Sequence, residues 1–249
     1  MGMGLPGARP DVVVTCQPLA EIVQGLMHGD CRRHRVDEAL HRSPSLLRGH
    51  LQQLIDAHPG HRLVLAMGLC GGATAGLRAG SGGLIMPRVH DCIALLLGSQ
   101  QAYRELAAAC AGTYYLSKGW AEAPGSLLAE CARYAEQWGA RKAGRIFSVL
   151  LGNYRRLIYI HAGLPGEDLT AERGRAFAAR LNLDFAIERA DLSLLRELLR
   201  GTPTPGAITI RAGARTSLSD FLEPLAANCP SRPIAPPDGG RGYAPDGNC

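Results

Sequence analysis

The 249-residue chain contains few aromatic residues, little charge and no long apolar run. Aromatic residues make up 5% of it, and its basic clusters, at 32–35, 141–145 and 155–156, belong to no aromatic-interleaved stripe, so nucleic acid is not an expected partner. The longest apolar runs fall far short of the roughly 20 residues that a membrane-spanning helix needs. The N-terminus lacks the basic start and apolar core of a signal peptide. These absences predict a cytoplasmic protein that binds neither membranes nor nucleic acid.

What the chain does have is an ordinary globular composition, 46% hydrophobic and 20% charged, together with eight cysteines. Cytosolic reductants keep thiols reduced, so a disulfide framework is not expected. No two cysteines form a C-x-x-C pair, so the spacing is not that of a zinc finger or ribbon. Free cysteine often serves as a small buried apolar residue. We interpret five cysteines in this structural way: Cys31, Cys110, Cys131, Cys229 and Cys249.

Short apolar runs alternate with helical periodicity along most of the chain. Strands are predicted at 12–15, 63–67, 83–86, 113–116, 157–160, 185–188 and 207–211. Helices are predicted at 18–26, 45–57, 91–98, 103–109, 126–154, 169–181 and 192–199.

This alternation predicts an α/β fold with a doubly wound, mostly parallel sheet and helices on both faces, and it also allows two similar halves. A single domain is expected over residues 12–229. A flexible N-terminus over 1–11 precedes it. The segment 230–249 is rich in proline and glycine and has no periodicity, so a disordered tail is expected there.

Three cysteines lie where predicted strands end. Cys16 and Cys70 each follow a strand, and Cys92 comes with His90 shortly after a third. Ligands of parallel sheets bind outside the carboxyl ends of the strands, so these side chains are expected at one rim. Three thiolates and one imidazole form a tetrahedral zinc set. The sequence therefore predicts a metal site, with zinc as the expected ion, made of Cys16, Cys70, His90 and Cys92.

The same residues allow other interpretations. Cys16 and Cys92 each precede or open a helix, which is expected to depress their pKa. Cys70 and Cys92 are predicted catalytic groups, and without a metal they would act as paired acid/base or nucleophilic thiols. Asp91 is a third predicted catalytic residue, either capping the helix or orienting His90. Structural filler remains an alternative for each cysteine.

Several neighbours are candidates for holding a cofactor or substrate. Gly71 and Gly72 would let a phosphate or cofactor approach the backbone, although a tight turn is the alternative because the full G-x-G-x-x-G is absent. Arg88 would hold an anionic substrate or extend to solvent. Lys118 and Trp120 follow a predicted strand and belong to the same rim. The roles of four further residues are left open: His41, Tyr114, Tyr115 and Trp120.

Four blocks in order, MGLCGG, PRVHDCIALLLGSQQAY, AGTYYLSKGWAEA and LGNYRRLIYIHAG, resemble those of the bacterial and archaeal family DUF1638, over residues 12–211. A cysteine at the position of Cys16 belongs to the same pattern. Members often carry CGN where this chain has Cys70, Gly71 and Gly72. The family has no established activity. Some members are thought to be encoded near corrinoid-dependent methyltransferase components, so the resemblance implies a corrinoid protein or methyltransferase component as a partner.

These observations give three hypotheses. The leading one is a metal-thiolate protein that performs or supports transfer chemistry on a small-molecule substrate, with one-carbon or methyl transfer implied by the resemblance. The second is a metal-free cysteine enzyme with paired thiols. The third is a non-enzymatic accessory protein that binds a corrinoid, a metal or a small anion.

Overall fold

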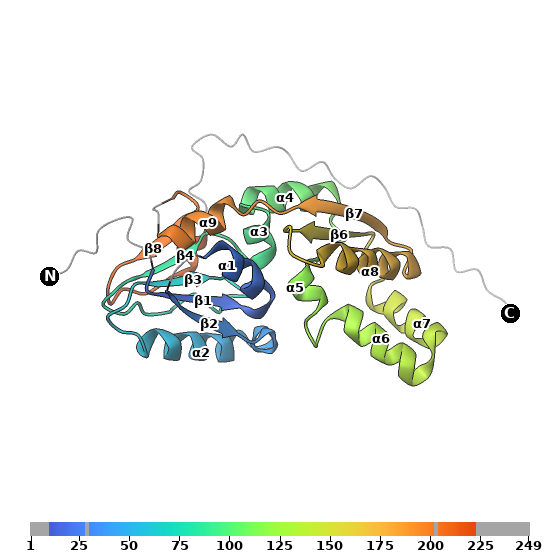
Figure 1. Cartoon of the computed structure of the whole chain (residues 1–249), viewed down its shortest axis with the longest axis horizontal. Coiled ribbons are helices and arrows are strands. Elements are labelled where there is room, and N and C mark those ends of the chain that lie inside the picture. The colour runs from blue at the N-terminus through green and yellow to red at the C-terminus, as the bar shows by residue number, and fades with distance from the viewer. Residues whose placement is uncertain (1–9, 28–29, 202–203, 223–249) are drawn as a thin grey trace, which may run out of the picture.

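The computed structural model describes residues 10–27, 30–201 and 204–222. Most of the expected N-terminal segment and all of the expected tail at 230–249 lie outside these residues. The described chain forms a mostly parallel five-stranded sheet and a parallel three-stranded sheet, with helices around both (Figure 1). The α/β class, the parallel strands and the flanking helices are thus confirmed, and the strands divide between two sheets. No helix in this part of the chain is long and apolar enough to cross a membrane.

The five-stranded half consists of these elements. Its strands are β1 (Val12–Cys16), β2 (Arg32–Val36), β3 (Leu63–Ala66), β4 (Leu84–Pro87) and β8 (Ala207–Ile210). Its helices are α1 (Ala20–Leu26), α2 (Pro44–Asp56), α3 (Cys92–Leu96), α4 (Gln100–Ala109) and α9 (Ser193–Arg200), with 3₁₀ turns η1 (Gln17–Leu19), η2 (Glu38–Arg42) and η3 (Leu218–Phe221).

The order of strands in this sheet is β2-β1-β3-β4-β8, and only β8 runs antiparallel to its neighbour. The chain steps outward from β1 to β2 and then crosses back to β3. The winding therefore reverses between β1 and β3, which makes this position the topological switch point, where doubly wound sheets bind ligands. In Figure 1, α2 lies on one face of the sheet, while α1 and α9 lie on the other.

The central strands predicted from the sequence are buried on both faces of the sheet. All five residues of β1 and all four of β3 are buried, and such strands are continuous apolar runs. By contrast, β2 is an edge strand with the sequence RRHRV, in which only Val36 is buried. Because its arginines are exposed, β2 was not predicted from the sequence.

The three-stranded half has the order β5-β6-β7, all parallel. The stretch predicted as one helix at 126–154 is two, because Gly139 separates them with a φ of 82°, which glycine tolerates without strain. The strands are β5 (Thr113–Leu116), β6 (Arg156–His161) and β7 (Asp184–Arg189). The helices are α5 (Lys118–Ala121), α6 (Leu127–Trp138), α7 (Ala140–Leu150) and α8 (Glu167–Arg180).

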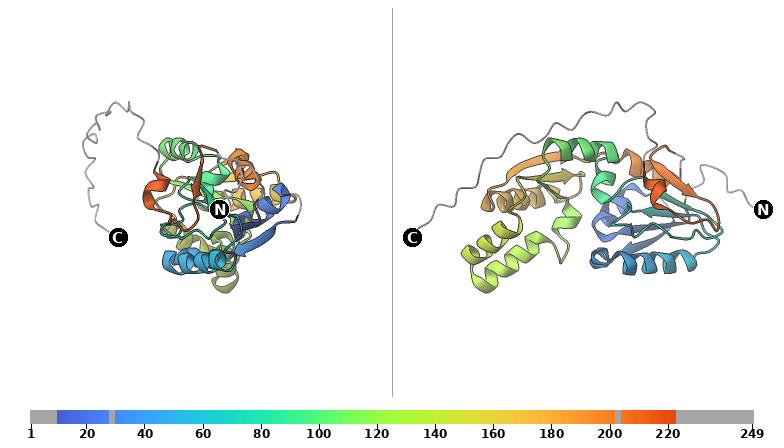
Figure 2. Two further views of the ribbon diagram at one scale, coloured as in Figure 1. Left: turned by 90° about the vertical axis from the view of Figure 1, so that its left-hand side faces the viewer. Right: turned by 180° about the vertical axis from the view of Figure 1, so that it is seen from behind.

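The two halves share hydrophobic core. Ile158 and Ile160 of β6 join the core of the five-stranded half, whereas Leu157 and Tyr159, which alternate with them, belong to the core beside α6, α7 and α8. The chain passes between the halves through α4 and again between β7 and α9 (Figures 1 and 2). The turn after β1 contacts α5, which follows β5. The carboxyl ends of β1 and β5 therefore meet between the halves.

Candidate functional site

Three cysteine side chains meet near the switch point. Cys16 ends β1, Cys70 follows β3, and Cys92 is the first residue of α3, after β4. The Cys16 thiol is hydrogen-bonded to that of Cys92, and the charges of Cys70 and Cys92 both act on Cys16. Cys92 also acts on Cys70. We call Cys16, Cys70 and Cys92 the thiol cluster, and its position is the one that the sequence predicts.

Close backbone approach brings Cys70 beside Cys92. The backbone N–H of Cys70 donates to the carbonyl of His90 at 2.8 Å. Two residues earlier, a Cβ on Gly68 would lie only 2.6 Å from the backbone nitrogen of Asp91. Glycine is thus required at position 68, since any side chain would push apart the two segments that carry Cys70 and Cys92.

The backbone at Cys70 is strained. Its φ is 48°, in the left-handed region that non-glycine residues rarely adopt. Such a conformation costs roughly 1–3 kcal/mol and is concentrated at functional sites. Gly71 and Gly72 continue with φ of 67° and 92°, and the carbonyl of Gly72 accepts a hydrogen bond from the Arg48 guanidinium at 2.8 Å. These glycines therefore form the tight turn that sets the position of Cys70.

Asp91 and His90 are neighbours in sequence but make different contacts. Asp91 is the N-cap of α3, and its Oδ1 accepts the backbone N–H groups of Ile93 and Ala94, each at 3.0 Å. This fixes the start of the helix that Cys92 opens. His90 is exposed, and its backbone N–H donates to the side chain of Gln100 at 2.8 Å. Within the described residues, no contact joins the His90 imidazole to the thiol cluster.

The fold raises the pKa of two of these thiols, those of Cys16 and Cys70. The hydrogen bond to Cys92, burial and the nearby sulfur charges raise the pKa of Cys16 well above its usual value. Burial, followed by the charges of Cys92 and Asp91, raises the pKa of Cys70. The depressed pKa expected of Cys16 from its place before a helix is therefore not found, since crowding and burial act in the opposite direction and outweigh it.

Trp120, on α5, contacts the thiol cluster from the other half. Its indole Nε1–H donates to the Sγ of Cys92 at 3.1 Å. It reaches this place because Gly119 packs directly on the backbone of Pro18, in the turn that follows Cys16. From the sequence, Trp120 is expected on the rim but has no assigned role, because nothing local shows that α5 docks there.

A cavity of about 220 Å³ adjoins Trp120 and is lined also by His41, Glu38 and Arg42. The ring of His41 lies edge-on to that of Trp120, with centroids 6.3 Å apart. Burial lowers the pKa of His41, so its imidazole is neutral. Its Nδ1 is buried without a hydrogen-bond partner among the described residues. A neutral imidazole therefore lies beside the indole that contacts Cys92.

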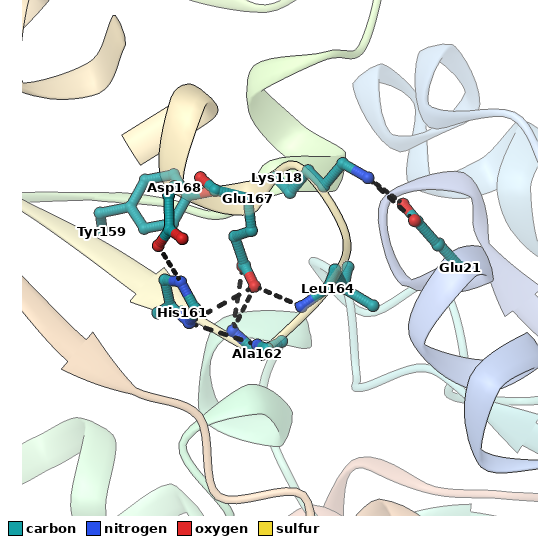
Figure 3. Close-up of polar contacts among 9 residues, drawn as sticks. Glu21, Lys118, Tyr159, His161, Ala162, Leu164, Glu167 and Asp168 are labelled. Atoms are coloured by element: carbon teal, nitrogen blue, oxygen red, sulfur yellow. Dashed lines mark hydrogen bonds and ion pairs between the residues drawn. The ribbon is translucent and has the colours of Figure 1, made fainter. Parts of the chain in front are cut away.

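The two basic residues predicted to hold a cofactor have protein partners. The Lys118 ammonium lies 2.8 Å from both carboxylate oxygens of Glu21 on α1, as Figure 3 shows. This ion pair joins the two halves and raises the pKa of Lys118. Arg88 donates from Nη1 to the carbonyl of Leu222 at 3.3 Å, while its Nε is buried without a partner in the described part of the chain. Lys118 is thus placed to connect the halves.

The two tyrosines of β5 both pack against other rings. Tyr114 lies edge-on to Tyr154, with centroids 5.7 Å apart, and burial raises the pKa of Tyr114 to about 12. Tyr115 lies 5.6 Å from Tyr103, and its hydroxyl is buried without a partner in the described residues. Both tyrosines therefore serve ring packing around β5.

A second polar constellation lies at the carboxyl end of β6, and it was not predicted from the sequence. The Glu167 carboxylate, 1% exposed, accepts the backbone N–H of Ala162 at 2.9 and 3.0 Å and that of Leu164 at 2.7 Å. His161 lies between Glu167 and Asp168, with its Nε2 3.0 Å from Asp168 Oδ1 (Figure 3). The signal for this constellation was the sequence HAGLPGED, in which a histidine directly follows a predicted strand and an acidic pair ends the loop.

As the side chains stand, no three histidine, cysteine, aspartate or glutamate residues in the described part of the chain are arranged to hold a metal ion. Cysteine is a ligand for soft metals only in its thiolate form, so the thiol cluster supplies a suitable type of ligand without the arrangement that a bound ion requires. The predicted metal site is therefore reduced to its three cysteines, with no imidazole beside them among the residues that the structure describes.

Comparison with known proteins gives one relationship. No curated protein and no solved structure matches the chain. A family model described as "Protein of unknown function (DUF1638)" matches residues 35–199. The matched span includes Cys70, Cys92, Trp120 and His161, whereas Cys16 lies before it. The resemblance drawn from the sequence is thus confirmed, and the chain belongs to the DUF1638 family.

Proposed function

We propose that the thiol cluster binds a thiophilic metal ion, zinc in the first instance, and that the protein uses this site in transfer chemistry on a small molecule in a reducing, cytoplasmic compartment. The observation that carries the proposal is the convergence of Cys16, Cys70 and Cys92 from three separate strand ends at the switch point. Filler cysteines have no reason to gather at the position where doubly wound sheets bind their ligands.

The electrostatics of the thiol cluster support the proposal. Thiols that raise one another's pKa are an unfavourable grouping for anions, and a metal cation removes that penalty because it binds the thiolate form. A bound ion would draw the three sulfurs closer together, and cysteine side chains adjust by χ1 rotation between staggered wells. The backbone strain at Cys70 is also explained if this residue is positioned to bind the metal, because such strain is concentrated at functional sites.

The other residues have roles that follow from their contacts. A bound metal ion would supply Lewis-acid character and hold a thiolate nucleophile. The Trp120 N–H, donating to Cys92 Sγ, orients that sulfur and disperses its charge. The cavity beside Trp120 accommodates a small substrate, and the neutral His41 imidazole is available there as a proton acceptor. Asp91 is a positioning residue, because it caps the helix that Cys92 opens.

The type of transfer rests on the family alone. A one-carbon or methyl group, and a corrinoid protein or methyltransferase component as a partner, remain proposals from the resemblance. An accessory protein that binds its ligand without turnover is the alternative. Stoichiometric metal binding without turnover of any methyl donor would favour the accessory role.

Metal content tests the proposal directly. We expect protein purified without chelator to contain about one equivalent of metal by mass spectrometry, and the Cys70→Ser and Cys92→Ser variants to lose it. Cys131→Ser is the matched control, because Cys131 is also buried but belongs to the core beside α6. Titration with Cd²⁺ should give a thiolate-to-metal charge-transfer band that is lost in the same two variants. Metal-free, folded wild-type protein that also binds no added Zn²⁺ or Cd²⁺ would reject the proposal.

A metal-free thiol pair of Cys70 and Cys92 is the second candidate, and the effect of Cys92 on the pKa of Cys70 is the observation in its favour. That function needs a thiolate near neutral pH, whereas the raised pKa values of Cys16 and Cys70 predict protonated, slowly reacting thiols. Iodoacetamide labelling at pH 7, read by mass spectrometry, separates the two candidates. Slow labelling of the thiol cluster, with protection by Zn²⁺, supports the metal site. Rapid labelling unaffected by a chelator would support the thiol pair instead.

A further inference from the structure

A separate cavity of about 450 Å³ opens at the carboxyl end of the three-stranded sheet, at the end of β6 and β7. It is lined by His161, Asp168, Ile187 and Arg189, together with small residues of the loop after β6. Its volume is in the range that holds small-molecule ligands. The position is also the usual one, because parallel sheets bind ligands beyond the carboxyl ends of their strands. None of the residues of the thiol cluster lines this cavity.

The strand register gathers the lining side chains. His161 of β6 pairs with Arg189 of β7, and Tyr159 pairs with Ile187. Because side chains alternate along a strand, Ile187 and Arg189 point to the same face of the sheet as His161. Ile187 is 47% exposed there. An apolar wall is thus left open beside a basic side chain.

The lining carries one charge of each sign. The Asp168 side chain is 100% exposed, and its Oδ1 is held by the Nε2 of His161 at 3.0 Å. The exposed Arg189 guanidinium has no hydrogen-bond or ion-pair partner within the described residues, and it lines the same cavity as this carboxylate. The second ring nitrogen of His161 accepts the backbone N–H of Gly163 at 3.3 Å. Both nitrogens of His161 are engaged, so it is a positioning residue for Asp168 and not a free base.

The loop that forms the cavity wall is fixed before any ligand arrives. The buried carboxylate of Glu167 binds the backbone N–H groups of Ala162 and Leu164, so that its charge is satisfied within the loop (Figure 3). A wall held in this way gives up little conformational entropy on binding. The cavity therefore combines four features: a loop braced by Glu167, the Asp168 carboxylate held by His161, the exposed Arg189 guanidinium, and the apolar side chain of Ile187.

We propose that this cavity binds a small zwitterion of the α-amino acid class. Arg189 pairs with the carboxylate of the ligand, Asp168 accepts hydrogen bonds from its ammonium group, and Ile187 contacts its side chain. A simple anion fits less well, because the exposed Asp168 carboxylate repels it, and a simple cation is repelled by Arg189. This site is independent of the proposed metal at the thiol cluster.

Binding is tested on the full chain by isothermal titration with the twenty common L-α-amino acids, one at a time. We expect at least one to bind, and its N-acetyl and methyl ester derivatives, which each lack one charge, to bind at least tenfold more weakly. Arg189→Met and Asp168→Asn should each weaken binding at least tenfold. The matched controls Arg35→Met and Asp184→Asn, exposed charges away from this cavity, should bind as the wild type does.

Cys70→Ser should retain amino acid binding, which separates this proposal from that of the metal site. All variants are checked for folding by circular dichroism, and the substituted side chains are exposed, so folding is expected to survive. The proposal is overturned if no amino acid in the panel binds, if a derivative with one charge binds as tightly as its parent, or if Arg189→Met and Asp168→Asn bind as the wild type does.

Discussion

Gly119→Ala should separate the two halves of the protein at the point where they make the thiol site. A Cβ at position 119 would overlap the carbonyl oxygen of Pro18 and lie 2.6 Å from two of its carbon atoms. Real Cβ atoms essentially never come closer than 3.0 Å, so the two backbones would have to move apart. The clash involves backbone atoms of Pro18, so no side-chain rotation can relieve it.

The cost of this clash follows from its geometry. Overpacking inside a protein typically costs about 1–3 kcal/mol, and contact of Cβ with backbone belongs at the upper end, so we expect Gly119→Ala to lose about 3 kcal/mol of unfolding free energy. Urea denaturation followed by circular dichroism measures it. Gly144→Ala is the matched control, because Gly144 lies in α7 with nothing within 4 Å of the place that an added methyl group would take, and it should gain about 0.5–1 kcal/mol.

The same variant tests the position of Trp120. The chain has two tryptophans, so Trp120 is the single one in a Trp138→Phe background. All tryptophan fluorescence of this variant then comes from the side chain that contacts Cys92. Gly119→Ala should change the emission of Trp120, and it should weaken Zn²⁺ binding if the thiol cluster binds the metal. An unfolding free energy within about 0.5 kcal/mol of the wild type, with unchanged emission, would refute the docking of α5 on the turn after β1.

Three further predictions follow from single groups. The raised pKa values of Cys16 and Cys70 make the metal-free protein less stable as the pH rises above the ordinary thiol pKa of 9.0, because the unfolded chain releases protons that the folded chain retains. The urea midpoint of the wild type should therefore be lower at pH 10 than at pH 8. This difference should be smaller in Cys70→Ser. Asp91→Ala should cost about 1 kcal/mol in urea denaturation, whereas Asp91→Asn, which keeps the cap acceptor, should cost less. Glu167→Gln should cost about 1–3 kcal/mol and speed hydrogen exchange of the Ala162 amide, because it replaces an accepting oxygen with a donor; unchanged exchange would contradict the assigned contacts.

The sequence is most informative where burial alone decides the structure. Continuous apolar runs identified the central strands, and their ends correctly placed Cys16, Cys70 and Cys92 together, because parallel strands share one carboxyl edge. Edge strand β2 was not predicted from the sequence, because an edge strand need not be buried on both faces and so need not be a continuous apolar run. Helix α5 was not predicted because its four residues carry no periodicity, and it is stabilised by contacts with distant parts of the chain, including the packing of Gly119 on Pro18.

Side-chain direction is what the sequence could not supply. His90 and Cys92 are two apart, so in a continuing strand they would point the same way. Strand β4 instead ends at Pro87 and Asp91 caps α3, so Cys92 is buried while His90 is exposed. The prediction for the pKa of Cys16 was wrong for a similar reason: the place of a cysteine beside a helix is local, whereas the crowding of its thiol by Cys92 arises only from the fold.

The meeting of the two halves explains why the thiol site carries a tryptophan at all. Cys16, Cys70 and Cys92 belong to the five-stranded half, and Cys92 Sγ also accepts a hydrogen bond from outside that half. The donor comes from α5 of the other half, which is held in place by the packing of Gly119 on Pro18 and by the ion pair of Lys118 with Glu21. The cavity beside Trp120 is lined by residues of both halves, so a movement that parts the halves would remove the hydrogen bond to Cys92 and widen this cavity at the same time.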